Sequence, residues 1–159
     1  MDNRGKQFEL KMQKDFLKTI ENSTIDRLYD TMNGYKSISN ISDFIGYVYP
    51  NIFYLECKTH KGASIPFDKI TQYDKLKEKI GIPGVRCGVV LWLYEHNEIG
   101  VIYVPISTIK KMKEDGQKSF GIRHLDNENY PSYVLPTIKR KQVFLDTDYS
   151  SLLNLKDGE

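Results

Sequence analysis

The sequence has few of the residues that build disulfide scaffolds or zinc sites. It contains only two cysteines, Cys57 and Cys87, which are far apart in the chain, and three scattered histidines. Neither set has the close spacing typical of metal ligands or of a small cross-linked domain. A disulfide framework and a zinc site are therefore both unexpected.

Long apolar runs are also missing. No stretch approaches the roughly 20 apolar residues that a membrane helix needs, and the first residues are polar where a signal peptide has its apolar core. The chain also lacks a glycine-rich phosphate loop and a Gly-x-Ser-x-Gly serine motif. We expect a soluble, cytoplasmic protein with no membrane span and with neither of these chemistries.

What the chain does have is a globular composition. Its 159 residues are 40% hydrophobic and 28% charged, which suits one domain with a substantial core. The net charge is +2, but residues 146–159 hold four acidic residues and one lysine. We predict a single domain over residues 1–145, with a mildly basic body, followed by an acidic C-terminal tail over residues 146–159.

The first half of the chain predicts a helix and a hairpin. Residues 5–20 repeat large apolar side chains every four positions, which is typical of an amphipathic helix. Residues 41–49 and 52–58 are rich in Ile, Val, Phe and Tyr and flank Pro50-Asn51, which is turn material. These two runs predict a β-hairpin.

The second half predicts alternating helices and strands. We expect a helix over residues 69–80, a strand buried on both faces over 85–94, and a second strand over 99–104. A helix capped by Ser107 and ending near Gly116 follows, then short strands over 133–135 and 143–145. This order favours an α/β fold with a central mixed β-sheet flanked by helices.

Charged residues interrupt the hairpin on one face. Side chains alternate along a strand, so Glu56 and Lys58 share a face. Symmetric pairing about Pro50-Asn51 would set Ile45 opposite Glu56 and Asp43 opposite Lys58, with Asp43 diagonal to Glu56. Two carboxylates and one ammonium group would then converge.

Two interpretations of this cluster stay open. Adjacent carboxylates repel each other and become tolerable when a divalent cation lies between them, and oxygen ligands favour Mg²⁺, with Mn²⁺ as a substitute. Such a cation beside a lysine is suited to phosphodiester hydrolysis. The alternative is a solvated strand face with a cross-strand ion pair.

The same residues resemble a nuclease motif. Asp43-x12-Glu56-x-Lys58 is similar to the PD-(D/E)XK pattern, with Ser42 at the usual proline position. More specifically, residues 3–103 resemble RecU-type Holliday junction resolvases. The further matching features are Asn3-Arg4-Gly5 followed by Glu9, Gly46 three positions after the aspartate, Ser64-Ile65-Pro66-Phe67, and Gln72.

The resemblance implies a restriction-endonuclease-like core and a set of site residues. It implies that Asp43 and Glu56 hold the metal ion, that the Cys57 carbonyl contributes to the metal site, and that Lys58 assists the attack. Glu9 and Gln72 would complete the catalytic site. Without the resemblance, Glu9 would be read as a surface residue and Gln72 as a helix cap or solvated side chain.

Basic residues near the proposed site are candidates for DNA contacts. A flexible loop at Lys61-Gly62 follows the Glu-x-Lys motif, and such loops can track phosphates. The predicted DNA-binding residues are Arg4, Lys6, Arg27, Lys61 and Lys69. Each of them taken alone could also be ordinary surface charge.

The resemblance implies a Mg²⁺-dependent endonuclease that resolves four-way junctions in DNA recombination and repair, in a bacterial cell or encoded by a phage. Two symmetric cuts require two active sites, so a homodimer is expected. Two alternatives stay open: the same nuclease core acting on ordinary duplex or single-stranded DNA, and a DNA-binding relative that has lost activity.

Overall fold

A six-stranded mixed sheet forms the centre of the structure, a computed structural model that describes residues 3–29, 40–141 and 144–159. In spatial order its strands are β1 (Thr24–Arg27), β2 (Phe44–Val48), β3 (Asn51–His60), β5 (Val85–Leu93), β6 (Val101–Pro105) and β8 (Tyr133–Val134). The pair β3 and β5 is parallel and the other neighbours are antiparallel. The predicted α/β fold with a central mixed sheet is confirmed.

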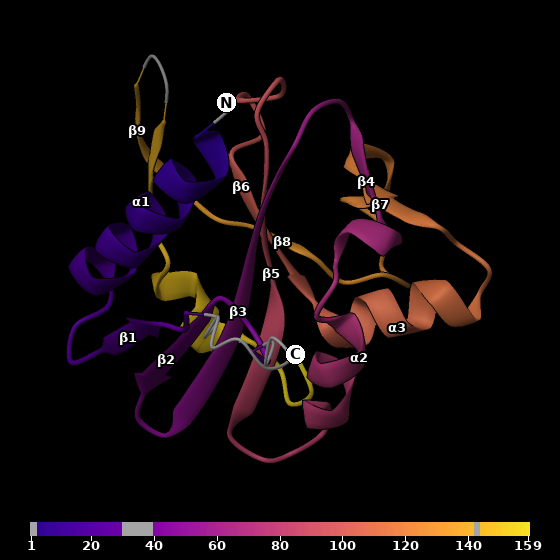
Figure 1. The fold of residues 1–159 in the computed structure, drawn as a ribbon, viewed down its shortest axis with the longest axis horizontal. Helices are drawn as coiled ribbons and strands as arrows, with labels where there is room; N and C mark the ends of the chain where they lie inside the picture. Colours follow the sequence, from indigo (N-terminus) through magenta and orange to yellow (C-terminus); the bar gives the residue numbers. More distant parts are fainter. Residues whose placement is uncertain (1–2, 30–39, 142–143) are drawn as a thin grey trace, which may run out of the picture.

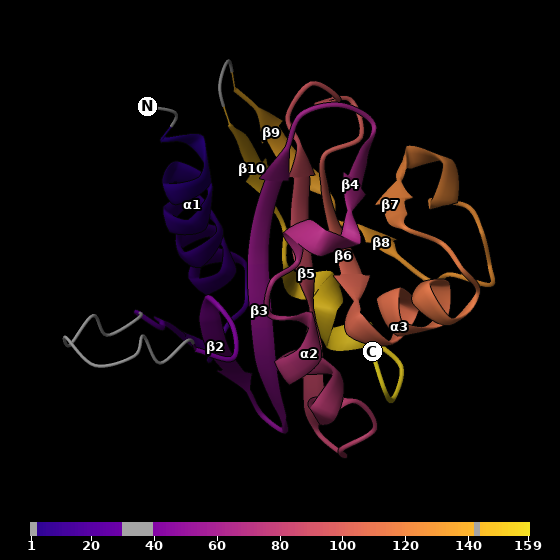
Figure 2. The same ribbon diagram turned by 45° about the vertical axis from the view of Figure 1, so that its right-hand side comes forward.

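Helices cover both faces of this sheet. Helix α1 (Arg4–Thr19) lies on one face, and α2 (Tyr73–Leu76) and α3 (Ile106–Glu114) lie on the other (Figures 1 and 2). The apolar residues of α1 recur every four positions, so Phe8, Met12 and Phe16 all turn inward and are at most 4% exposed. They pack in one cluster with alternate residues of β3, including Phe53 and Leu55.

Strand β5 contributes side chains to both hydrophobic clusters of the core, one on each face of the sheet. Val90 and Trp92 belong to the cluster under α1, whereas Val89 and Leu91 belong to the cluster under α2 and α3. All four side chains are at most 3% exposed. The predicted strand buried on both faces is therefore confirmed, and it anchors the parallel neighbour β3 that carries the Glu-x-Lys motif.

The hairpin forms, but the predicted register was wrong by two residues. Val48 pairs with Asn51 and Ile45 pairs with Tyr54, so the two-residue connection is Tyr49-Pro50 and Asn51 belongs to the strand. Proline has no amide hydrogen to donate to the ladder, which suits Pro50 to the connection. A shift of two preserves the side-chain face, and it moves Asp43 from opposite Lys58 to opposite Glu56.

The predicted helix over residues 69–80 is broken into short pieces. These are the 3₁₀ turn η1 (Phe67–Lys69), helix α2 and the 3₁₀ turn η2 (Lys77–Lys79). Ile70 has φ −95° and ψ 78°, outside the helical region, yet its side chain is buried. Apolar residues at helical spacing are thus buried here without a continuous helix.

Several short elements were absent from the sequence prediction. They are β1, the pair β4 (Ser64–Pro66) and β7 (Ser119–Gly121), the turn η3 (Ile122–His124), strand β9 (Thr137–Arg140) and the turn η4 (Ser150–Asn154). Of the two short strands predicted near the end, the first is β8. The second began at residue 143, outside the described residues, and β10 (Leu145–Thr147) begins two residues later.

The C-terminal segment packs into the fold. Tyr149, Leu152 and Leu155 are buried in the cluster under α1, although the charges of residues 146–159 set this segment apart in the sequence. The division into a domain and an acidic tail stays a prediction. Among the helices of the described residues, none is both long and apolar enough to cross a membrane.

Candidate active site

The candidate site forms where the pairing between β2 and β3 ends. Phe44 opens β2 and pairs with Arg27 of β1 on one side and with Leu55 of β3 on the other. Asp43 immediately precedes β2, and the same register sets it opposite Glu56. The part of β3 after Leu55 continues beside β5 without a β2 partner, so the site lies at an open edge of β3.

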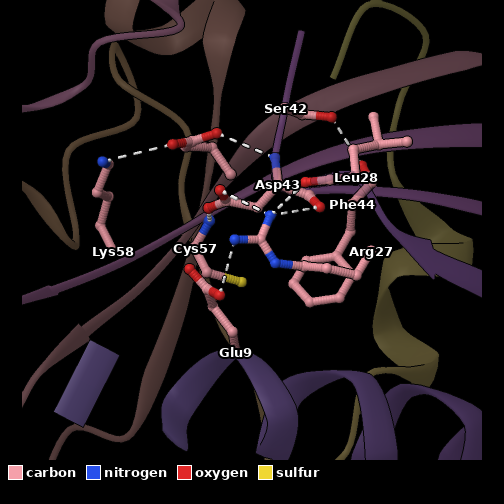
Figure 3. Close-up of polar contacts among 9 residues, drawn as sticks. Glu9, Arg27, Leu28, Ser42, Asp43, Phe44, Cys57 and Lys58 are labelled. Carbon is pink, nitrogen blue, oxygen red and sulfur yellow. Dashed lines mark hydrogen bonds and ion pairs between the residues drawn. The ribbon is translucent and has the colours of Figure 1, made fainter. Parts of the chain in front are cut away.

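Two main-chain hydrogen bonds hold the carboxylates at this edge (Figure 3). The amide of Cys57 donates to Asp43 Oδ2 at 2.9 Å, and the amide of Asp43 donates to Glu56 Oε2 at 3.2 Å. Just before them, the buried Ser42 hydroxyl donates to the Phe44 carbonyl at 2.7 Å. The start of β2 is thus fixed, and with it the position of Asp43.

Lys58 approaches the carboxylate pair from the same strand. Its Nζ lies 3.4 Å from Glu56 Oε1, as expected for side chains two residues apart on one face of β3. The shared face of Glu56 and Lys58 predicted from the sequence is confirmed. The lysine is partly exposed, so its ammonium can meet both Glu56 and a group arriving from solvent.

Arg27 joins Asp43 to Glu9 of α1. Its Nη1 lies 3.3 Å from Asp43 Oδ1, and its Nη2 lies 3.1 Å from Glu9 Oε2. Nη1 also donates to the main-chain carbonyls of Leu28 at 2.7 Å and Asp43 at 3.0 Å. The structure therefore brings Glu9 and Arg27 to the site, and the predicted contact of Arg27 with DNA stays a prediction.

Burial and the negative charge of neighbouring carboxylates disfavour the ionised form of the carboxyl groups at this site. Burial, and then the charge of Asp43, raise the pKa of Glu56 to about 7, although Lys58 acts in the opposite direction. Burial and Asp43 also raise the pKa of Glu9, against the effect of Arg27. Perturbed carboxyl groups gathered at an accessible edge are typical of functional sites.

This protein is similar to known proteins in its fold and not in its sequence. The sequence matches no protein-family model, and no curated protein is similar enough in sequence to count as a relative. Solved structures of similar shape include Hjc from Archaeoglobus fulgidus, a Holliday junction resolvase from an archaeal hyperthermophile. The TM-score is 0.53 at 17% identity, over 80% of this chain and 92% of that chain.

The chain has a restriction-endonuclease-like fold. This confirms the fold that the motif residues implied, whereas the specific kinship with RecU-type resolvases stays a prediction. Within this restriction-endonuclease-like fold, Asp43, Glu56 and Lys58 lie together on adjacent strands, as their spacing in the motif requires.

The donor atoms at this edge fit a hard divalent cation. The described residues contain no group of three or more acidic, histidine or cysteine side chains arranged to hold a metal ion. Mg²⁺ does not need such a group, because it commonly uses one or two carboxylates and keeps several waters. Asp43, Glu56 and the Cys57 carbonyl would supply oxygen ligands. Burial raises the pKa of the Cys57 thiol, which leaves its sulfur protonated and unsuited to binding Mg²⁺.

The structure does not bring Gln72 into this network. Its carbonyl accepts the Leu76 amide at 3.0 Å at the start of α2, and its side chain forms no hydrogen bond with any described residue. The sequence left two interpretations of Gln72 open, a catalytic residue or a helix cap or solvated side chain. Its position at the start of α2 matches the second. A catalytic role for Gln72 stays a prediction.

The remaining basic candidates lie on several different elements. Lys61 follows β3 and is exposed, and Lys69 is exposed in η1. The Arg4 guanidinium lies 3.9 Å from the centre of the Tyr94 ring, and Lys6 is exposed on α1 one turn before Glu9. Their roles in DNA binding stay predictions.

Sequence reasoning missed the part that Arg27 plays within the site. The residue is 16 positions before Asp43, and only the pairing of β1 with β2 brings the two together. Strand β1 has four residues, of which only Ile25 is buried, so its pattern gave no strong strand signal. The acidic partners Glu9 and Asp43 were the one available hint that a cation would be needed between them.

Proposed function

We propose that this protein is a Mg²⁺-dependent endonuclease that cuts branched DNA, in the manner of a RecU-type Holliday junction resolvase. The observation that carries the proposal is the hydrogen-bonded pair of Asp43 and Glu56, with Lys58 beside it, at an open strand edge of a restriction-endonuclease-like fold. Metal-dependent phosphodiester hydrolysis uses carboxylates that hold a cation beside the substrate, and this edge of β3 supplies the carboxylates.

Asp43, Glu56 and the Cys57 carbonyl would hold the cation. Bound there, Mg²⁺ would polarise the phosphodiester and lower the pKa of a water beside it. The Lys58 ammonium is placed to offset negative charge that develops on the phosphate oxygens as the attack proceeds. Arg27 neutralises Glu9 and orients Asp43 through its oxygen Oδ1.

Basic residues on either side of the β3 end provide the path for DNA. The start of α1 lies near this end of the strand, since a methyl group added at Gly5 would lie 3.9 Å from Thr59 Oγ1. Figures 1 and 2 show the start of α1 and the connection from β3 to β4 at the same end of the molecule. Arg4 and Lys6 from the helix and Lys61 from the connection can therefore contact phosphates beside the site.

A four-way junction has two equivalent strands to cut, so the active form is a homodimer with one site for each strand. Cleavage of labelled four-way junctions and of matched linear duplex, each in Mg²⁺ or EDTA, tests the proposal. We expect paired symmetric nicks in the junction, none in EDTA, and little cutting of the duplex.

The other outcomes distinguish the alternatives. Equal cutting of junction and duplex would retain the nuclease and discard junction specificity. Tight DNA binding without cutting in Mg²⁺ or Mn²⁺ would favour a relative that has lost activity. Neither binding nor cutting of DNA would overturn the proposed function altogether.

A further inference from the structure

A hollow lies directly beside the candidate site and has no part in holding the metal ion. It has a volume of about 300 Å³ and lies between α1 and the β1–β2 edge. Among the described residues, its walls are formed by Lys6, Glu9, Leu10, Gln13, Arg27, Tyr29 and Phe44. We refer to it as the α1–β1 hollow.

The hollow shares a wall with the active site. Arg27 lines it and also lies 3.3 Å from Asp43, and Phe44 follows Asp43 directly in the chain. A DNA strand whose phosphate reaches the carboxylates would therefore carry a neighbouring nucleotide to the mouth of the hollow. The position of the hollow relates it to the substrate strand, not to a remote ligand.

The walls combine apolar and aromatic surface with two cations, Lys6 and Arg27, and with the Glu9 carboxylate that pairs with Arg27. Tyr29 is 75% exposed and Leu10 is 67% exposed, so both side chains are open to an incoming group. The Arg27 guanidinium lies between two rings, 5.4 Å from the centre of Tyr29 and 5.5 Å from that of Phe44. Lys6 adds a second, exposed cation at the wall.

One uncharged polar side chain in the wall, that of Gln13, can form a hydrogen bond with a bound molecule. Gln13 Nε2 donates to the Ile25 carbonyl at 3.2 Å, which fixes the amide, and Oε1 accepts no hydrogen bond from any residue that the structure describes. Aromatic and guanidinium faces stack on nucleobases, and cations bind the adjoining phosphates. A metal ion would find mainly apolar walls.

We propose that the α1–β1 hollow binds one unstacked nucleobase of the DNA strand next to the cleavage point, with Tyr29 as its stacking platform. The inference rests on the proposed function and deepens it. Branched DNA presents unstacked bases at the crossover more cheaply than continuous duplex does, since removing a base from a duplex costs a few kcal/mol. The hollow therefore favours a branch point as the substrate.

The test uses the full-length protein and a four-way junction with 2-aminopurine, an adenine analogue whose fluorescence rises on unstacking, at positions next to the mapped nick. In EDTA, where the strand stays intact, the wild-type protein should raise the emission of one such position. Tyr29→Ala should abolish that rise and weaken junction binding by about tenfold. Tyr29→Phe, which keeps the ring, should retain both.

Tyr49→Ala is the matched control, because Tyr49 is 82% exposed in the connection at the opposite end of β2. It should leave emission and binding unchanged. A wild-type protein that binds and cuts the junction without any emission change would overturn the base pocket and leave the proposed function intact. So would equal losses in Tyr29→Ala and Tyr49→Ala. Binding of free dAMP that prevents junction binding would assign the hollow to a soluble nucleotide instead, and failure to bind any DNA would overturn both proposals.

Discussion

The amide of Asp43 donates a hydrogen bond to Glu56 Oε2 at 3.2 Å, so the main chain of one candidate metal ligand binds the side chain of the other. In return, the carboxylate of Asp43 accepts the amide next to Glu56, that of Cys57, at 2.9 Å. Strand pairing therefore sets the spacing of the two carboxylates directly. The site depends on the hairpin register more than on long, flexible side chains.

Replacing Glu56 by Gln should stabilise the metal-free protein at neutral and alkaline pH. The folded-state pKa of Glu56 is raised from 4.5 to about 7, chiefly by burial, so ionising this group opposes folding. The penalty is absent below pH 4.5, grows as the pH rises toward 7, and is complete above it. We expect Glu56→Gln to be more stable by about 2 kcal/mol at pH 8 in EDTA, and inactive.

Urea unfolding of both proteins at pH 4 and pH 8 measures this difference. The two free energies of unfolding should be nearly equal at pH 4 and diverge at pH 8. A Glu56→Gln protein that is less stable than the wild type at pH 8 would show that the ionised carboxylate contributes favourably to the fold.

Replacing Arg27 by Ala should make the protein depend more on divalent cations. Arg27 pairs with both Glu9 and Asp43 in a half-buried position, and its loss leaves two carboxylates without their shared cation. We expect a loss of about 1–2 kcal/mol of stability in EDTA. Thermal unfolding in EDTA and in Mg²⁺ should show a larger Mg²⁺-induced rise in Tm for Arg27→Ala than for the wild type. An equal Mg²⁺-induced rise in Tm in both proteins would show that Arg27 does not influence cation binding at the site.

Lys58 and Lys61 should have different effects although they are three residues apart. Lys58 contacts Glu56, so Lys58→Ala should lower the cleavage rate at least a hundredfold with little change in junction affinity. Lys61 is exposed beyond β3, so Lys61→Ala should weaken binding and reduce the slope of log K against log[salt] by about one. Single-turnover cleavage and a salt titration of binding measure the two effects. If Lys58→Ala weakened binding and Lys61→Ala lowered the cleavage rate, the roles assigned to the two lysines would be wrong.

Asp146 should stabilise the fold at neutral pH through two lysines and lose this effect in acid. Its carboxylate lies 2.6 Å from Lys11 Nζ and 3.2 Å from Lys141 Nζ, and chiefly Lys11 lowers its pKa from 3.8 to about 2. A depressed pKa stabilises the fold above the unfolded value and loses that effect as the pH falls toward the folded value. Asp146→Asn should therefore lower Tm at neutral pH, and the difference should vanish near pH 2. A constant difference across this range would rule out ion pairing as its cause.

The sequence predicted those parts of the fold that depend on local patterns. The four-residue repeat of Phe8, Met12 and Phe16 defines α1, and the apolar run of residues 85–93 defines β5. The register of the hairpin depends on which two residues form the connection. A Pro-Asn pair does not decide this, and the prediction was therefore two residues off.

The spacing of the motif predicted Asp43, Glu56 and Lys58, the resemblance alone predicted Glu9, and neither predicted the ion pairs of Arg27. Asp43, Glu56 and Lys58 are adjacent because the motif spacing encodes one hairpin, and that adjacency could be deduced. The position of Arg27 depends on a four-residue strand with little burial, and that of Glu9 depends on how α1 crosses the sheet. Such long-range placements come from tertiary packing and leave no periodic signal in the sequence.

The most direct test of the account is single-turnover cleavage of a labelled four-way junction in Mg²⁺ by the wild-type protein and by Asp43→Asn. Asparagine keeps the size of the side chain and an oxygen that can accept the Cys57 amide, so Tm should show that the variant is folded. The account predicts symmetric nicks by the wild type and no cleavage by the folded variant. Full cleavage by Asp43→Asn would contradict it.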